Sequence, residues 1–161
     1  MSGPESKCIL CRGVDGDAEL GVVQVWEDSL WRLTLGLDAE VLGFCHLEPK
    51  RHIPHITDLD GAEARTLGPV LARVSRALQE ATGAEVVYVY VFGGGVPHLH
   101  LHLAPHRTGD ALSSQIIKGE LIEERLPSGA TRIISKEFPP LSETEQRAVA
   151  ERVRQRLFAE A

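Results

Sequence analysis

Alternating apolar and polar residues predict several β-strands in the first third of the chain. The clearest alternation covers residues 30–37, where apolar side chains occupy every second position, a pattern typical of a half-buried antiparallel strand. Apolar stretches at 19–26 and 41–48 predict a strand on either side of it. Short polar segments at 15–17 and 28–29 predict turns. We therefore expect the fold to begin with antiparallel strands.

The spacing of apolar residues changes after residue 60, where it follows the period of a helix. Asp60 is expected to cap this helix, with Glu63 completing a capping box, and Gly83 is expected to end it. The apolar residues at helical spacing are Leu67, Val70, Leu71, Val74, Ala77 and Leu78. The pattern thus predicts one long amphipathic helix after the first strands.

A second group of strands is expected beyond this helix. Residues 85–92 are almost all β-branched or aromatic, which predicts a buried central strand. Residues 98–105 alternate again and are expected to form its hairpin partner. The segment 107–138 contains several turn signals and is ambiguous, with one short strand predicted at 131–134.

The end of the chain predicts a second helix. Ser142 and Glu145 form a second capping box, and valine, leucine and alanine residues follow at helical spacing, so we expect a helix over 142–159. The order of elements predicts an α+β fold with an antiparallel sheet of five or slightly more strands, a long helix and a C-terminal helix. This helix is expected either to be part of the fold, or to pack over the functional site or against a partner subunit.

Length and composition fit one ordinary globular domain. The chain has 161 residues, of which 43% are hydrophobic and 25% charged. We expect a single domain over 1–161, with flexible residues 1–7 and a C-terminal extension, 107–161, that completes it.

Charge and hydropathy exclude several classes of partner. The net charge of −6 argues against a general nucleic-acid binder, which needs a basic face. No apolar stretch approaches the roughly 20 residues that span a membrane, and no secretory signal is evident at the N-terminus. We therefore expect a cytoplasmic protein that acts on neither nucleic acid nor membranes.

Candidate chemistry concentrates in three histidines. His98, His100 and His102 alternate with leucines, so a strand would place the three imidazoles on one face and the leucines in the core. Near neutral pH an imidazole can act as nucleophile, general base or metal ligand. The glycines of segment 93–95 allow backbone N–H groups to approach an anion.

Two cysteines near the N-terminus are a second candidate site. Cys8 and Cys11 have the spacing Cys-x-x-Cys, which in a reducing compartment indicates half of a metal site or a redox motif, with a free thiol pair as the alternative. Cys45 is most simply a buried apolar residue.

The sequence His98-Leu-His100-Leu-His102-Leu-Ala resembles the His-φ-His-φ-His-φ-φ signature, where φ is apolar, of the histidine triad (HIT) superfamily of nucleotide hydrolases and transferases. The sequence Gly43-Phe-Cys-His-Leu-Glu-Pro49-Lys-Arg-His52 is similar to the family segment Gly-His-x-Leu-Val-x-Pro-x-x-His before its long helix. The N-terminal cysteine pair is similar to that of zinc-bearing members. The resemblance covers most of residues 8–106 and implies a HIT-like fold.

The resemblance implies a two-step transfer. His100 would attack the α-phosphorus of a nucleotide ester, phosphoramidate or dinucleoside polyphosphate, forming a nucleotidyl-histidine that water or another acceptor resolves. A hydrogen-bond acceptor, expected to be a backbone carbonyl, must fix the tautomer of His100. His102 would contact the phosphate. His98 and the backbone amides of Gly93, Gly94 and Gly95 are expected among the substrate-binding groups.

The resemblance also implies a structural zinc ion. Its ligands would be Cys8, Cys11, His52 and His98, a closed tetrahedral set with no open position for a reactive water. His55 is an alternative to His52, and His46 is a weaker candidate. His46, His55 and His106 are otherwise expected to be ordinary histidines.

The match departs from the family at two places. Phe44 follows the glycine where the family usually has histidine, and residues 90–97 contain neither the Asn nor the Gly-Gln pair that usually contacts ribose and phosphate. An alternative function is therefore a non-catalytic nucleotide- and zinc-binding module. A third hypothesis, a metallohydrolase with all three triad histidines on one ion, is disfavoured because alternate residues of a strand spread too far apart. Homodimerisation is expected from the resemblance.

Overall fold

The computed structural model describes residues 7–112 and 120–159, and its centre is an antiparallel sheet of five strands. The expected flexibility of the N-terminus falls largely on residues 1–6, which lie outside the described residues. The strands are β1 (Val22–Glu27), β2 (Trp31–Gly36), β3 (Cys45–Pro49), β4 (Val86–Tyr90) and β5 (Leu101–His106), in the spatial order β1-β2-β3-β5-β4. The α+β fold with a five-stranded antiparallel sheet is thereby confirmed.

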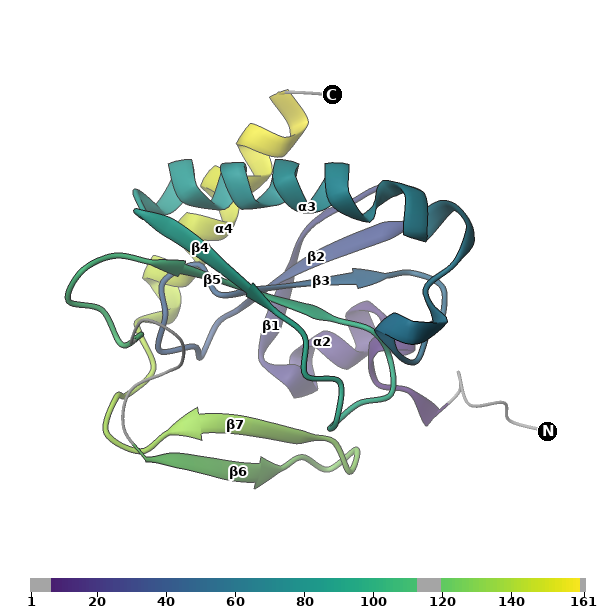
Figure 1. Cartoon of the computed structure of the whole chain (residues 1–161). Helices are drawn as coiled ribbons and strands as arrows, with labels where there is room; N and C mark the ends of the chain where they lie inside the picture. Colours follow the sequence, from purple (N-terminus) through teal and green to yellow (C-terminus); the bar gives the residue numbers. More distant parts are fainter. Residues whose placement is uncertain (1–6, 113–119, 160–161) are drawn as a thin grey trace.

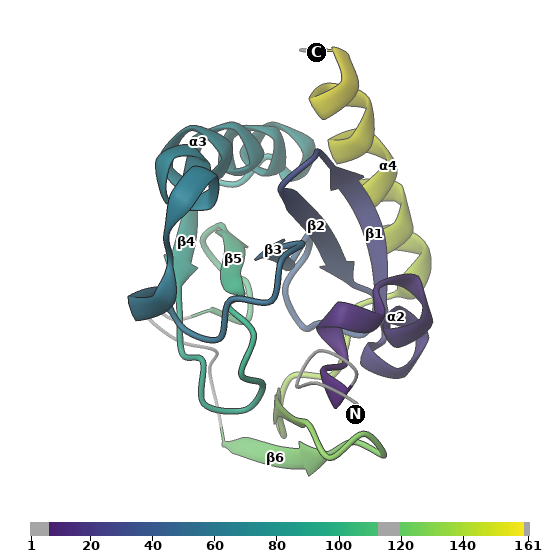
Figure 2. The ribbon, with the colours of Figure 1, turned by 90° about the vertical axis from the view of Figure 1, so that its right-hand side faces the viewer.

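The two long helices lie on one side of this sheet. They are α3 (Gly61–Thr82) and α4 (Glu143–Ala159). The short helix α2 (Val14–Leu20) and a hairpin of β6 (Leu121–Arg125) and β7 (Thr131–Ser135) lie on the other side (Figures 1 and 2). Two 3-10 turns, η1 (Leu10–Arg12) and η2 (Ile56–Asp58), complete the elements. No helix in the described part of the chain is both long and apolar enough to cross a bilayer.

The core lies between the sheet and the long helices. The alternating leucines of β2 and β5 point into it, as expected: Leu33, Leu35 and Leu103 are fully buried. They pack in one cluster with residues of both helices, including Val74, Leu78, Val149, Val153 and Leu157. The terminal helix α4 is therefore part of the fold and lies on the face opposite the triad imidazoles.

The predicted turn between the first two strands is present. The Asp28 carboxylate accepts the backbone N–H groups of Leu30, at 2.8 Å, and of Trp31, at 2.7 Å. These bonds close the turn and set the register in which β1 pairs with β2.

The turn expected at residues 15–17 is wrong, because these residues belong to helix α2. Gly16 lies within this helix, where a Cβ atom would collide with the carbonyl oxygen of Ile9. The glycine therefore serves close packing of the helix on the N-terminal segment, and its turn-like sequence context is misleading.

The prediction that residues 85–92 form a central strand is also wrong. Strand β5 inserts between β3 and β4, so β4 is an edge strand of the sheet. Val86 and Val89 are 39% and 40% exposed. The strand and its hairpin pairing with β5 are confirmed, but the apolar composition does not reflect burial within this chain.

The ends of α3 confirm one helix signal and contradict another. Gly83 ends the helix with a positive φ of 68°. Asp60 occupies the N-cap position without a side-chain cap bond, and both Asp60 and Glu63 instead accept hydrogen bonds from Arg51. The expected capping box is therefore an ion-pair cluster on the guanidinium.

The hairpin of β6 and β7 belongs to the segment that the sequence left ambiguous. The short strand at 131–134 is confirmed, and its partner β6 was not expected. The hairpin turn packs Leu126 and Ala130 against Ile9 of the N-terminal segment. Part of the ambiguous segment, residues 113–119, lies outside the described residues.

Candidate functional site

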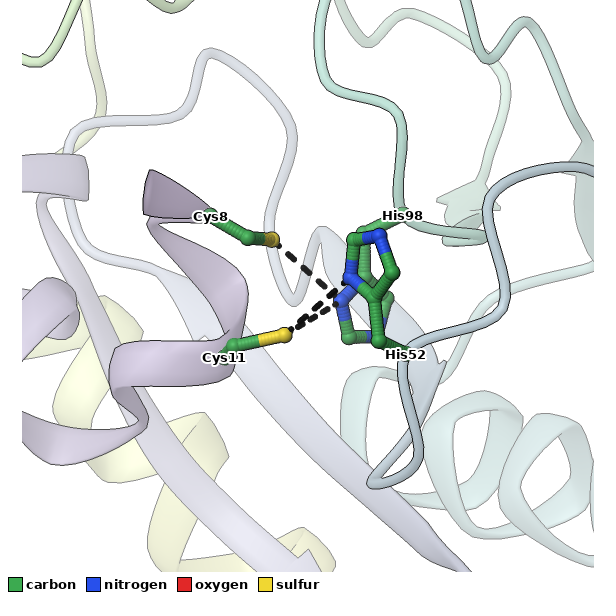
Figure 3. Close-up of side chains that lie close together, drawn as sticks. All are labelled: Cys8, Cys11, His52 and His98. Atoms are coloured by element: carbon green, nitrogen blue, oxygen red, sulfur yellow. Dashed lines mark hydrogen bonds between the residues drawn. The ribbon is translucent and has the colours of Figure 1, made fainter. Parts of the chain in front are cut away.

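Four side chains with metal-binding atoms converge beside the start of β5 (Figure 3). Cys8 and Cys11 come from the N-terminal segment, His52 from the loop after β3, and His98 from the loop before β5. The four donor atoms all lie within 4.8 Å of one another. The sulfur of Cys8 lies 3.4 Å from Nδ1 of His98, and the sulfur of Cys11 lies 3.3 Å from the same atom.

The hydrogen bonding of His98 prepares this residue to bind a metal. Its Nε2 lies 2.8 Å from the carbonyl oxygen of Pro49, so Nε2 carries the proton and Nδ1 presents its lone pair to the cysteines. Burial lowers the pKa of His98, which keeps the ring in the neutral, ligating form. The side chain is 1% exposed.

The donor set fits a structural zinc ion. Zinc–sulfur and zinc–nitrogen bonds in a tetrahedral site imply sulfur-to-nitrogen separations of about 3.5 Å. The separation between the Cys11 sulfur and Nδ1 of His52 is 3.2 Å, close to that value. The described residues therefore bring together all four ligands that the sequence resemblance implied.

The alternative ligands lie elsewhere. His55 is exposed and begins the turn η2, where its backbone N–H bonds the Asp58 carboxylate at 3.1 Å. Cys45 is fully buried in the main core, as expected, and burial raises the pKa of its thiol. Neither His55 nor His46, the two alternative ligands, joins the four-residue cluster, and Cys45 also lies outside it.

His100 has one ring nitrogen committed to the backbone. Its Nδ1 lies 2.6 Å from the carbonyl oxygen of His98, so Nδ1 carries the proton and Nε2 holds the lone pair. The expected backbone acceptor for this imidazole is therefore present. A neutral imidazole held in this tautomer can act as a nucleophile through Nε2.

His102 lies within an aromatic surface on the same face of the sheet. The Tyr90 ring on β4 stacks on it, with ring centroids 4.9 Å apart and planes 9° apart. Burial and the neighbouring His100 lower the pKa of His102 to about 4, so the ring is neutral at pH 7. Its Nδ1 is buried and has no hydrogen-bond partner among the described residues.

A fourth histidine, His46, reaches the same face, although the sequence predicts only a weak candidate zinc ligand or an ordinary histidine at this position. It lies on β3 directly opposite His102, with ring centroids 4.9 Å apart. Its centroid is 6.0 Å from that of His100. Alternation along β3 is the available signal, because Cys45 and Leu47 face the core and the intervening His46 must therefore face the other side.

The glycine loop leads from β4 to the triad. Gly93 has a φ of 72°, a conformation that favours glycine. Gly94 has open space where a side chain would stand, and a Cβ on Gly95 would lie 3.3 Å from the carbonyl oxygen of Thr131 in β7. The hairpin thus approaches the end of this loop.

The other histidine of β5 belongs to a separate cluster. His106 bonds the Asp110 carboxylate at 2.8 Å and stacks on Tyr88. The three triad imidazoles do not form a shared group of metal ligands in the described residues, since His98 turns toward the cysteines. The geometry therefore gives no support to a metal ion held by the triad.

Comparison with known proteins decides the family. The family model described as the HIT domain matches residues 18–109, more than half of the chain. The chain belongs to the HIT family. The match includes the triad, His46 and His52, whereas the two cysteines of the metal cluster lie before it.

Similar proteins support this assignment over most of the chain. An uncharacterized HIT-like protein of Mycobacterium tuberculosis is 27% identical over 135 residues, covering 81% of this chain and 91% of that protein. A crystal structure of a histidine triad protein from Bradyrhizobium japonicum is 26% identical, with a TM-score of 0.64, and covers 84% of this HIT protein and 90% of its own chain.

A zinc-bound histidine triad family protein from Mycobacterium smegmatis has the same fold. The TM-score is 0.65 at 24% identity, and the alignment covers 99% of this chain and 100% of that one. The similarity therefore includes the C-terminal part of this HIT protein, beyond the limits of the family model.

Proposed function

We propose that this protein is a nucleotide hydrolase or nucleotidyltransferase that works through a covalent nucleotidyl-histidine on His100. Nε2 of His100 attacks the α-phosphorus of a nucleotide ester, phosphoramidate or dinucleoside polyphosphate, and the bond from phosphorus to the leaving group breaks. Water or another acceptor then attacks the same phosphorus and frees the histidine. The observation that carries this proposal is the bond from Nδ1 of His100 to the His98 carbonyl oxygen, which leaves Nε2 as the nucleophile.

The neighbouring groups are suited to a negatively charged phosphoryl group. His102 lies beside His100, with ring centroids 5.1 Å apart, and as a neutral imidazole it offers an N–H donor. The backbone N–H groups of Gly93, Gly94 and Gly95 would supply further donors to the equatorial oxygens.

We propose that Cys8, Cys11, His52 and His98 hold a zinc ion with a structural role. A closed Cys2His2 site supplies cross-linking of the chain and no reactive water. His98 makes this cross-link relevant to the reaction, because its side chain belongs to the cluster and its carbonyl oxygen holds His100. The cluster would thereby keep the nucleophile in register.

We also propose a single domain and a homodimer. The exposed valines of the edge strand β4 offer an apolar surface with unpaired backbone groups, which a second copy of the strand would cover. Sedimentation of the wild type and of Val89→Lys tests this, with a dimer expected only for the wild type. A cytoplasmic location is proposed because reduced thiols are needed at Cys8 and Cys11.

The activity is tested by incubating the protein with an adenylate phosphoramidate or with a dinucleoside polyphosphate labelled at the α-phosphate. We expect release of a nucleoside monophosphate and, after rapid acid-free quenching, label on His100. Tight nucleotide binding without any turnover would instead support a non-catalytic module, the function favoured by the absence of Asn and Gln from residues 90–97.

A further inference from the structure

The face of the sheet that carries His100, His102 and His46, here called the reaction face, lacks the Asn and the Gly-Gln pair that usually contact ribose and phosphate. The transition state spreads charge over the equatorial oxygens, which are stabilised by positioned N–H or cationic groups. The chain contains no asparagine, and no glutamine lies within residues 90–97. Arg32 is on the same face of the sheet but is paired with Asp17 and Glu48.

His46 lies beside the two triad histidines of this face. It faces His102 directly across the β3–β5 pair, and its ring is close to both His100 and His102. The centroids of the three rings are 4.9, 5.1 and 6.0 Å apart. With a phosphoryl group on Nε2 of His100, a non-bridging oxygen would have to come within about 2.9 Å of an imidazole nitrogen of His46 to accept its hydrogen bond.

We propose that His46 is a further catalytic residue, whose imidazole N–H donates a hydrogen bond to a non-bridging oxygen of the phosphoryl group transferred to His100. This role rests on the proposed function and adds to it. His46 stabilises charge without giving up its proton, so the covalent steps at His100 are unchanged.

The surroundings of His46 suit a neutral donor. Burial, together with the nearby His102 and His100, holds the pKa of His46 well below its usual range, so the ring carries one N–H at pH 7 and does not act as an acid. The Phe44 ring meets it edge to face, with centroids 5.1 Å apart. This contact restricts the ring and reduces the reorganisation needed when the phosphate arrives.

The test compares His46→Leu, which removes the donor, with His46→Gln, which retains an N–H donor. His106→Gln is the matched control, because His106 lies on the same face of β5 but bonds Asp110. We expect kcat to fall about 100-fold in His46→Leu with KM changed less than about threefold, and about tenfold recovery in His46→Gln. The control is expected to retain wild-type kcat.

A second readout separates contact with the phosphate from a structural effect. Substrates with sulfur in place of one or the other non-bridging oxygen are compared as separate diastereomers. In the wild type, the diastereomer whose sulfur faces His46 is expected to react about tenfold more slowly than the other. In His46→Leu this preference is expected to disappear, because the hydrogen bond it reports is already absent.

The inference is overturned if His46→Leu turns over at the wild-type rate, or if its diastereomer preference is unchanged. It is equally overturned if the Leu and Gln variants lose the same activity. Zinc content and melting temperature are measured for each variant, and a folded His46→Gln still decides the question if His46→Leu does not fold. If the wild type shows no turnover and no label on His100, the proposed function fails, and the role of His46 fails with it.

Discussion

The candidate metal site and the proposed reaction face contain histidines that are neighbours in the sequence, His98 and His100, but the two side chains lie in opposite environments. His98 is 1% exposed, and both its ring nitrogens meet protein atoms. His100 is half-buried, and one of its ring nitrogens remains available. The difference shows that a repeated residue in a motif does not imply a repeated role.

The backbone explains how two adjacent positions of the motif separate. Strand β5 begins only at Leu101, so both His98 and His100 precede it and need not follow the alternation of a strand. The N–H of His98 bonds the carbonyl oxygen of Val96 at 2.8 Å, and its side chain turns toward the N-terminal cysteines. Residues 98–100 thus connect the closed cluster to the open face. The cluster fixes the position of this segment through the His98 side chain, and the open face presents the Nε2 atom of His100.

The substitution His100→Asn tests most directly whether the reaction face and the metal cluster act independently. Loss of the proposed nucleophile is expected to reduce nucleotide turnover by about 1,000-fold or more, while zinc content and melting temperature stay at wild-type values. Monophosphate release and metal analysis are measured on the same sample. Turnover within tenfold of the wild type would contradict the role of His100, and loss of zinc would show that the two regions are not separable.

The converse change is Cys8→Ser, which removes one ligand from the cluster. We expect zinc content to fall and the melting temperature to drop by about 10 °C, because metal binding contributes directly to folding. Turnover is expected to decrease as the His98 carbonyl loses its fixed position. Cys45→Ala is the matched control, since Cys45 is a buried cysteine outside the cluster, and unchanged zinc content in Cys8→Ser would refute the ligand assignment.

The sequence predicted the residues of both regions better than their arrangement. Local alternation identified β2 and β5, and Gly83 ended the long helix where expected. The sequence does not single out His46, because its place beside His102 depends on the pairing of β3 with β5, a contact between residues distant in sequence.

Two errors in the fold have the same origin. The apolar segment of β4 suggests a central strand, but burial depends on strand order, which the local pattern does not encode. Asp60 and Glu63 have the spacing of a capping box, but the Arg51 guanidinium competes for both carboxylates. In both cases, contacts outside the local segment determine the structure: strand order for β4, and Arg51 for Asp60 and Glu63.

A smaller expected effect concerns the stability of the folded protein at low pH. The pKa of His102 is lowered to about 4 in the folded protein, so between pH 6.5 and 4 the unfolded chain binds a proton that the folded chain does not. Stability therefore falls as the pH decreases through this range, by about 1.4 kcal/mol per pH unit for one such group. The free energy of unfolding decreases between pH 7 and pH 4.5. In His102→Leu we expect this decrease to be about 2 kcal/mol smaller than in the wild type.

Urea unfolding at the two pH values measures this difference. Acid also releases metal from the cysteine and histidine cluster, but that contribution is common to the wild type and the variant and cancels in the comparison. His106→Leu, on the same strand, is the control. An equal pH dependence in the wild type and His102→Leu would mean that the reaction face contributes nothing to acid sensitivity.

The smallest expected effect is that of Arg51→Met, beside the metal ligand His52. Arg51 bonds both carboxylate oxygens of Glu63 at 3.1 Å, but its side chain is 49% exposed, and solvent screens such pairs strongly. We expect the melting temperature to fall by only about 2 °C and zinc affinity to change less than about threefold, as followed by thermal unfolding and competition with a chelator. Because His98, Cys8 and Cys11 hold the cluster from other segments, a large loss of zinc in Arg51→Met would show that its geometry depends on this exposed ion pair, and the contrast between a closed cluster and an open face would then need revision.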